Sequence, residues 1–278
     1  MVAVTAEELT PDPAPKAGIT ITGLGVGASI VNVWRTADGR RKPVRGARRI
    51  LMNDASFVTD WDVPTNRRVS YEVEVLSGPN GPARANAEAV TVPSDCSWLM
   101  DPFVPQTAIP VFGLRKNKGD IYLRSQALAA LEYGADISMF NVMGSKEPMA
   151  LFGERMAEKG LDLSMGTRSA EENTKLKALL NSTSGFLFRP GPELEGLDLD
   201  GSMFIAIPSP VQLPVDVGYG GEMTWWDLKA DTVMAPTIKV LTATFTYGDV
   251  QMLFTTYGQK QDAMAGRTYL DDLKNPLG

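Results

Sequence analysis

The sequence contains no histidine among its 278 residues. Histidine is the base in Ser-His-Asp and Cys-His catalytic arrangements and a common zinc ligand, so its absence excludes these classes of site. The single cysteine, Cys96, can form neither an intrachain disulfide nor a thiolate zinc cluster, and we interpret it as a small buried thiol. No G-x-S-x-G, S-x-x-K or G-x-x-x-x-G-K-[ST] motif is present. We therefore expect no enzyme activity, no cofactor and no metal site.

The sequence also lacks an excess of basic residues and a long apolar run. Lys and Arg total 27 against 33 Asp and Glu, giving a net charge of −6, which disfavours nucleic-acid binding. No apolar run approaches the roughly 18 residues of a membrane span, and the N-terminus lacks the basic and apolar regions of a signal peptide. We expect neither nucleic acid nor membrane insertion.

What is abundant is glycine and proline, with 26 and 19 residues respectively, which favours many short strands and turns. At about 150 residues per domain, the length predicts about two domains. The predicted fold class is mainly β, and the composition shifts along the chain suggest five segments. These are a Pro-rich arm (1–17), a β-sandwich (18–93), a Pro-rich connection (94–110), a β domain with one helix (111–244) and a C-terminal helical extension (245–278).

The sandwich prediction depends on short β-favouring runs separated by turn signals. In the clearest run, Val69, Tyr71, Val73 and Val75 alternate with polar residues, the period-2 pattern of a strand with one buried face. About six such runs within about 75 residues are typical of an immunoglobulin- or fibronectin-III-like sandwich. By contrast, prolines at positions 11, 13 and 15 favour an extended, unpacked arm.

The second domain contains one well-marked helix. Ser169 and Glu172 have the spacing of a capping box, and a stripe of leucines predicts the buried face of a helix that ends before Gly185. The stripe consists of Leu176, Leu179 and Leu180. We therefore expect strand, helix and strand in that order from 161 to 189, with further strands following.

Two aromatic features are candidates for a subunit interface. Trp225 and Trp226 are adjacent on a predicted strand, so one should point into the core and the other outward. Thr246 is a candidate cap for a helix ended by Gly258, with one apolar stripe that packs either on its own domain or on a neighbouring subunit. The stripe consists of Tyr247, Val250, Phe254 and Tyr257.

Three motifs that resemble ligand sites have simpler interpretations. Gly23, Gly25 and Ala28 match a dinucleotide fingerprint, but a strand-like run follows instead of a helix, so we expect a glycine-rich connection. The acidic run 193–201 lacks the distal Glu of an EF-hand, and we expect a solvated loop. The Asp-Trp-Asp run 60–62 favours a buried Trp between two solvated acids over a sugar-binding strand.

The second half of the chain resembles the minor tail proteins of siphophages that infect actinobacteria. The resemblance rests on GLDLSMGT, the capped helix ending in LKALL, FLFRPGP, and the C-terminal run FTYGDVQMLFTTYGQKQDAMAGRTYLDDL. It spans residues 17–278, except that 119–149 cannot be aligned to it. The resemblance implies that the second domain has a tail-tube or distal-tail fold, which forms rings by joining sheets between subunits.

The resemblance also implies a function. The chain would be a structural minor or distal tail protein, made in the host cytoplasm and placed at the virion tail tip. It would form a homo-oligomer, hexameric or trimeric, that contacts the tube, tape-measure and hub proteins. Two alternatives remain open. One is a carbohydrate- or host-receptor-binding module in which Trp61, Trp98, Trp225 or Trp226 stacks on sugar, and the other is a glycosidase that uses only two carboxylates.

Overall fold

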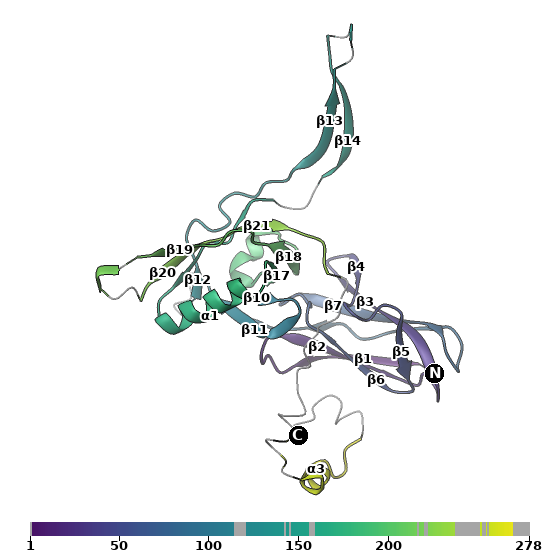
Figure 1. Cartoon of the computed structure of the whole chain (residues 1–278). Coiled ribbons are helices and arrows are strands. Elements are labelled where there is room, and N and C mark those ends of the chain that lie inside the picture. The colour runs from purple at the N-terminus through teal and green to yellow at the C-terminus, as the bar shows by residue number, and fades with distance from the viewer. Residues whose placement is uncertain are drawn as a thin grey trace.

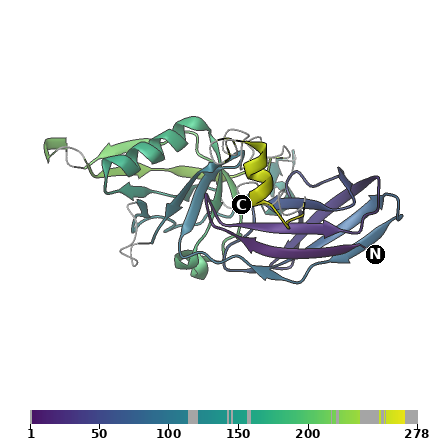
Figure 2. The same ribbon diagram turned by 90° about the horizontal axis from the view of Figure 1, so that it is seen from below.

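The computed structural model describes residues 2–113, 121–141, 143–144, 146–155, 159–215, 217–219, 222–236, 251, 254 and 256–268. This part of the chain is mainly β, as predicted, and its strands form several antiparallel sheets. Figures 1 and 2 show two groups of sheets placed end to end, with the N-terminal group at one end of the body. We call the region where the two groups meet the seam.

The N-terminal group consists of two sheets that share one core. A three-stranded sheet has the order β1-β2-β6, and a six-stranded sheet has the order β4-β3-β7-β8 with β5 and β9 paired to β3 and β7. The strands are β1 (Ala3–Leu9), β2 (Lys16–Thr22), β3 (Ala28–Ala37), β4 (Arg40–Pro43), β5 (Ile50–Asn53), β6 (Ser56–Asp60), β7 (Arg68–Ser77), β8 (Ala83–Asn86) and β9 (Val90–Thr91). Ile19 and Ile21 of β2 and Val33, Tyr71 and Val73 of β3 and β7 are buried in this core.

Local sequence signals explain the connections of this group. Strand β7 buries alternate residues as its period-2 pattern predicts. Asp38 and Gly39 have φ angles of 50° and 72°, the left-handed conformation of a tight two-residue hairpin turn between β3 and β4. Gly23 and Gly25, with φ of 74° and 90°, lie in the connection from β2 to β3, and no helix follows. The predicted glycine-rich connection is confirmed.

The predicted Pro-rich arm 1–17 is wrong for most of its length. Strand β1 pairs antiparallel with the whole of β2, from Ala3 opposite Thr22 to Leu9 opposite Lys16. Ala14 is fully buried, and the three prolines fall in the connection between the two strands. A chain segment gains this order because backbone pairing and burial against a neighbouring strand outweigh a local preference for an extended arm.

The second group also contains two sheets around a core. A six-stranded sheet has the order β11-β10-β17-β18-β21-β15, and a four-stranded sheet has the order β12-β16-β20-β19. The strands are β10 (Ser97–Asp101), β11 (Val104–Val111), β12 (Ile121–Leu123), β15 (Leu161–Asp162), β16 (Met165–Thr167), β17 (Gly185–Arg189), β18 (Met203–Ala206), β19 (Val211–Pro214), β20 (Thr224–Asp227) and β21 (Lys229–Thr232). Helix α1 (Ala170–Ser182) lies against this group (Figures 1 and 2).

Helix α1 forms as the sequence predicts. The Ser169 side chain accepts a hydrogen bond from the backbone N–H of Glu172, which satisfies one of the free donors of the first turn. Leu176, Leu179 and Leu180 are buried in the core of the second group. The helix ends at Ser182, and β17 begins at Gly185, so the predicted order of strand, helix and strand is confirmed.

The predicted Pro-rich connection 94–110 is also wrong. Residues 97–111 form the hairpin β10–β11, and Leu99 and Met100 of β10 are fully buried. Two of the prolines, Pro105 and Pro110, lie in β11, which is the end strand of its sheet. Proline fits an end strand because its missing N–H does not interrupt a ladder on the open side.

The remaining described elements lie outside these sheets. They are the hairpin β13 (Ala135–Phe140) and β14 (Met149–Arg155), the short 3-10 helices η1 (Pro192–Leu197) and η2 (Val217–Tyr219), and helix α3 (Tyr257–Ala263). The β13–β14 hairpin projects away from the body in Figure 1. None of the helices in the described ranges has the length and apolarity needed to cross a membrane.

Candidate functional site

The four-stranded sheet carries a row of side chains on its outer face. Tyr122 of β12 lies opposite Gly166 of β16, Gly166 lies opposite Trp225 of β20, and Trp225 lies opposite Leu213 of β19. Directly opposed residues share one face of a sheet. We call these four residues the outer row. Because a Cβ at Gly166 would come within 2.4 Å of the Tyr122 ring, glycine here leaves room for that ring to lie across β16.

Two residues of the outer row are exposed, and arginines flank the row. Trp225 is 36% exposed and Leu213 is 42% exposed. The Arg124 guanidinium carbon lies 4.3 Å from the centre of the Trp225 ring, and that of Arg168 lies 4.9 Å from the centre of the Tyr122 ring. Stacked guanidinium groups interact favourably with aromatic faces. The row therefore combines apolar contact area with positive charge.

Trp226 points to the opposite face, as adjacent strand residues should. It is 4% exposed, and its indole N–H donates to the Asn173 side-chain oxygen of α1 over 2.9 Å. The predicted opposition of Trp225 and Trp226 is confirmed. Trp226 is nevertheless wrong as an interface candidate, because it packs inside its own group of sheets.

The hairpin β13–β14 exposes apolar side chains on both of its faces. Ile137 lies opposite Phe152 on one face, and Phe140 lies opposite Met149 on the other. Phe152 is 79% exposed, and the other three are between 44% and 60% exposed. A two-stranded hairpin alone is only marginally stable in water, and an uncovered apolar patch marks a surface that associates. Strand β13 and the first residue of β14 fall in 119–149, the stretch that cannot be aligned to the tail-protein resemblance.

The predicted C-terminal interface stripe does not form one helix. Tyr247 and Val250 lie outside the described residues, and Phe254 is not helical. Helix α3 begins at Tyr257, where Thr256 forms a capping box with Gln259. The expected helix end at Gly258 is thus wrong. Because Thr256 caps a new helix, Gly258 is the second residue of that helix. Tyr257 is 87% exposed.

The other candidate tryptophans are less accessible than Trp225. Trp61 is buried as predicted, with the Lys16 ammonium 4.8 Å from the centre of its ring. Trp98 is half-buried, and its indole N–H donates to the Ser94 hydroxyl over 2.9 Å. The prediction that Asp60 and Asp62 are solvated is wrong, since they are 1% and 4% exposed.

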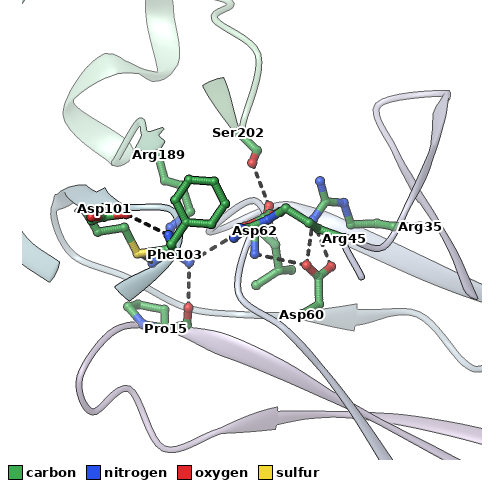
Figure 3. Close-up of polar contacts among 11 residues, drawn as sticks. Pro15, Arg35, Arg45, Asp60, Asp62, Asp101, Phe103, Arg189 and Ser202 are labelled. Atoms are coloured by element: carbon green, nitrogen blue, oxygen red, sulfur yellow. Dashed lines mark hydrogen bonds and ion pairs between the residues drawn. The ribbon is translucent and has the colours of Figure 1, made fainter. Parts of the chain in front are cut away.

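Both carboxylates belong to a charged cluster at the seam (Figure 3). Asp60 accepts hydrogen bonds from Arg35 Nη1, at 3.0 and 2.8 Å to its two oxygens, and from the Tyr71 hydroxyl at 3.0 Å. Burial alone would lower the pKa of Arg35, but Asp60 and Asp62 outweigh burial and raise it above the ordinary value. Burial, followed by the Asp60 charge, raises the pKa of Tyr71 well above 10. The cluster thus keeps Arg35 charged and Tyr71 neutral.

The Asp62 carboxylate holds a second arginine. Arg45 donates to it through Nε at 2.8 Å and through Nη2 at 2.6 Å, a bidentate pair with both side chains 6% exposed. The backbone oxygen of Asp62 accepts from the Ser202 hydroxyl at 2.7 Å, which joins the N-terminal group to the loop before β18. The pair is therefore fixed from both sides of the seam.

A third arginine, Arg189 at the end of β17, is fully buried. Its Nη1 donates to the backbone oxygens of Pro15 at 2.5 Å and Val63 at 3.4 Å (Figure 3). Burial is the main cause that lowers its pKa, to about 10, so it stays charged at neutral pH. A guanidinium from the second group thereby satisfies two carbonyls of the first.

The acidic run 193–201 is more ordered than predicted. Glu193 in η1 accepts from the backbone N–H and hydroxyl of Ser97, at 3.1 and 2.6 Å. Asp200 pairs with Lys42 at 2.6 Å and Arg40 at 3.4 Å across the seam. Within the part of the chain that the structure describes, no group of three or more potential Cys or carboxylate metal ligands occurs.

The comparisons with known proteins show no family. No protein-family model and no curated protein matches the sequence. Among solved structures, a match was found to Spo0M, a sporulation control protein from Bacillus subtilis, with 11% identity over 83% of this chain and 90% of that chain. Its TM-score is 0.19, which is too low to indicate a shared fold or function.

Proposed function

We propose that this chain is a structural component of a phage tail tip, a minor or distal tail protein that assembles into a ring or hub. The ring links the tail tube to other tail-tip proteins, such as the tape-measure and hub proteins. The chain is made in the host cytoplasm, forms a hexamer or trimer, and has no enzymatic role. The resemblance of residues 160–192 and 245–273 to minor tail proteins of actinobacterial siphophages is the source of this proposal.

The observation that carries the proposal is the exposed hairpin β13–β14. Both of its faces present large apolar side chains, such as Phe140 and Phe152, to solvent. Burying apolar area contributes about 25 cal/mol per Å², so both faces favour contact with other chains. Equivalent copies of one chain can cover both faces when the hairpin lies between neighbours in a ring.

The arrangement of the sheets supports the same proposal. The N-terminal sheets share one core, which fits an immunoglobulin- or fibronectin-III-like sandwich. The second group, with α1 against its sheets, fits a tail-tube or distal-tail domain. Its four-stranded sheet ends at one side in β19, which pairs with no further strand among the described residues, whereas the other end strand, β12, is bridged to Phe112 just after β11. Edge strands of this kind join sheets when subunits associate.

The test is the assembly state of the purified full-length chain and its place in the virion. Multi-angle light scattering should give a trimer or hexamer, and the double variant Phe140→Ser, Phe152→Ser should shift the mass toward the monomer. Leu51→Ser, at a residue 73% exposed on β5, is the matched control and should leave the mass unchanged. Antibody labelling of virions should mark the tail tip. A monomeric wild type together with unlabelled tail tips contradicts the proposal.

The second candidate is a carbohydrate- or host-receptor-binding module. The specific observation in its favour is the exposed Trp225 in the outer row, because sugars stack on exposed aromatic rings. A glycan array with wild type and Trp225→Ala separates the two functions. Saturable binding of a glycan by the monomer, lost in the variant, favours receptor binding, whereas no binding by either protein removes this candidate.

A further inference from the structure

A cavity of about 650 Å³ opens at the seam between the two groups of sheets. One wall comes from residues 35–48 of the N-terminal group, and the other comes from 202–204 and 232–236 of the second group. Its volume falls in the range of about 300–1,000 Å³ that is typical of pockets for small molecules. The buried Arg45–Asp62 pair, drawn in Figure 3, belongs to the lining of this cavity.

The lining carries more positive than negative charge. Its cations are Arg35, Arg40, Lys42, Arg45 and Arg48, and its acids are Asp62 and Asp200. Arg35 is neutralised by Asp60, Arg45 is paired with Asp62, and Asp200 is shared between Arg40 and Lys42. Arg48 is exposed and has no ion-pair partner among the described side chains. After these pairs are counted, the cavity retains an excess of positive charge that favours an anion.

Two buried polar atoms in this lining lack a hydrogen-bond partner. One is Arg45 Nη1, because Asp62 occupies only Nε and Nη2 of that guanidinium. The other is Thr232 Oγ1, on β21 in the opposite wall. Leaving a buried polar group unpaired costs about 1–3 kcal/mol, and more when the group is charged. Both residues belong to the lining of the cavity, which makes these two groups the candidate donors to a bound oxyanion.

Apart from Ser202, the rest of the opposite wall is apolar. Met203 and Phe204 of β18 and Met234 and Pro236 beyond β21 line the cavity. Such a wall suits the carbon skeleton of a ligand, while the cationic side suits its charged group. Arg45 is already oriented by Asp62, so it need not reorganise to bind an oxyanion.

We propose that this cavity binds a small organic anion through a phosphate or carboxylate group. Arg45 Nη1 and the Thr232 hydroxyl donate to the oxygens of that group, Arg48 adds long-range attraction at the rim, and the apolar wall contacts the remainder of the molecule. This binding site would exist whether or not the chain assembles into a phage tail.

Calorimetry on the full-length protein with three probes tests the chemistry. Glycerol 3-phosphate carries a phosphate, glucuronate carries a carboxylate, and glucose is uncharged. We expect saturable binding of at least one anion, weakened by added salt, and no binding of glucose. The tighter anion identifies which oxyanion the cavity prefers. Failure of both anions to bind at 10 mM, or glucose binding as tightly as either anion, overturns the proposal.

Variants of the cavity lining test the assignment of residues. Arg45→Lys keeps a charge beside Asp62 but removes Nη1, and it should weaken binding about tenfold. Thr232→Val keeps the shape and should weaken binding about threefold to tenfold. Arg48→Ala should weaken binding about twofold and reduce its salt dependence.

The matched control is Arg68→Ala, since Arg68 is likewise exposed and lies outside the cavity lining. It should bind as wild type does. Circular dichroism melting shows whether Arg45→Lys is folded, and Thr232→Val keeps the test decisive if it is not. Wild-type affinity in both Thr232→Val and Arg48→Ala contradicts the proposal.

Discussion

The strongest prediction concerns the buried carboxylate Asp60. It is 1% exposed and accepts from Arg35, from the Tyr71 hydroxyl and from the backbone N–H of Asp62. The substitution Asp60→Asn preserves the size of the side chain but removes its charge. One of its oxygens becomes an NH₂ group, which cannot accept from Arg35 or Tyr71.

The expected cost follows from what the variant leaves behind. Arg35 is 7% exposed, and because a guanidinium stays protonated at pH 7, the variant leaves it charged without its nearest counter-ion. Removing one partner of a buried ion pair destabilises a protein by about 3–5 kcal/mol. The control Glu72→Gln removes an ion pair to Arg41 in which the two side chains are 25% and 42% exposed, and exposed pairs contribute about 0–1 kcal/mol.

Urea unfolding at pH 7, followed by tryptophan fluorescence, measures this difference. The midpoint should fall strongly for Asp60→Asn and little for Glu72→Gln. Adding Arg35→Met to Asp60→Asn should recover part of the loss, since the uncompensated charge is then gone. Equal midpoints for Asp60→Asn and Glu72→Gln, or no recovery in the double variant, would refute the reasoning.

Three further predictions use the same unfolding assay. Burial raises the pKa of Tyr71, so the contribution of the protonated phenol to the free energy of unfolding is complete below pH 10 and is lost as the pH rises toward the folded pKa. Tyr71→Phe should therefore lose less stability than wild type between pH 9 and 11. Thr20→Val removes a buried hydroxyl that has no partner and should stabilise by about 1 kcal/mol, whereas Thr65→Val, which removes a donor to the Pro190 carbonyl, should destabilise. Gly191→Ala places a Cβ 2.4 Å from the backbone carbonyl carbon of residue 96 and should cost about 1–3 kcal/mol or more, while Gly196→Ala, with open space around it, should change little.

The elements that the sequence predicted well are those whose signals are local. Helix α1 is an example, because its cap at Ser169 and its leucine stripe lie within one short segment. Strand β7 is another, since its alternation directly reports one buried face. Trp225 and Trp226 were correctly placed on opposite faces for the same geometric reason.

The elements that the sequence missed depend on distant partners. Strand β1 is ordered by pairing with β2, and the hairpin β10–β11 is ordered by its place beside β17. Proline content alone favoured an arm and a connection in these two places. The edge position of β11, which makes Pro105 and Pro110 acceptable, is a property of the whole sheet.

The Asp-Trp-Asp run shows a different limit. Alternation assumes a strand with one face in water, but β6 ends at Asp60, and residues 60–65 are all buried where the two groups of sheets meet. Asp60 and Asp62 can be buried because Arg35 and Arg45 approach from other parts of the chain. Sequence spacing gives no information about that approach.

The seam also explains why one buried arginine is suited to bind a ligand. Arg35 and Arg189 face protein acceptors, Asp60 in one case and the carbonyls of Pro15 and Val63 in the other. Arg45 shares its guanidinium between Asp62 and a cavity that both groups of sheets line. An anion bound there contacts both groups and stabilises the folded chain by mass action, by about 2.7 kcal/mol at 100 times its Kd. That gain approaches the cost of losing Asp60, so ligand at the seam can strengthen the same junction that the ion pairs hold.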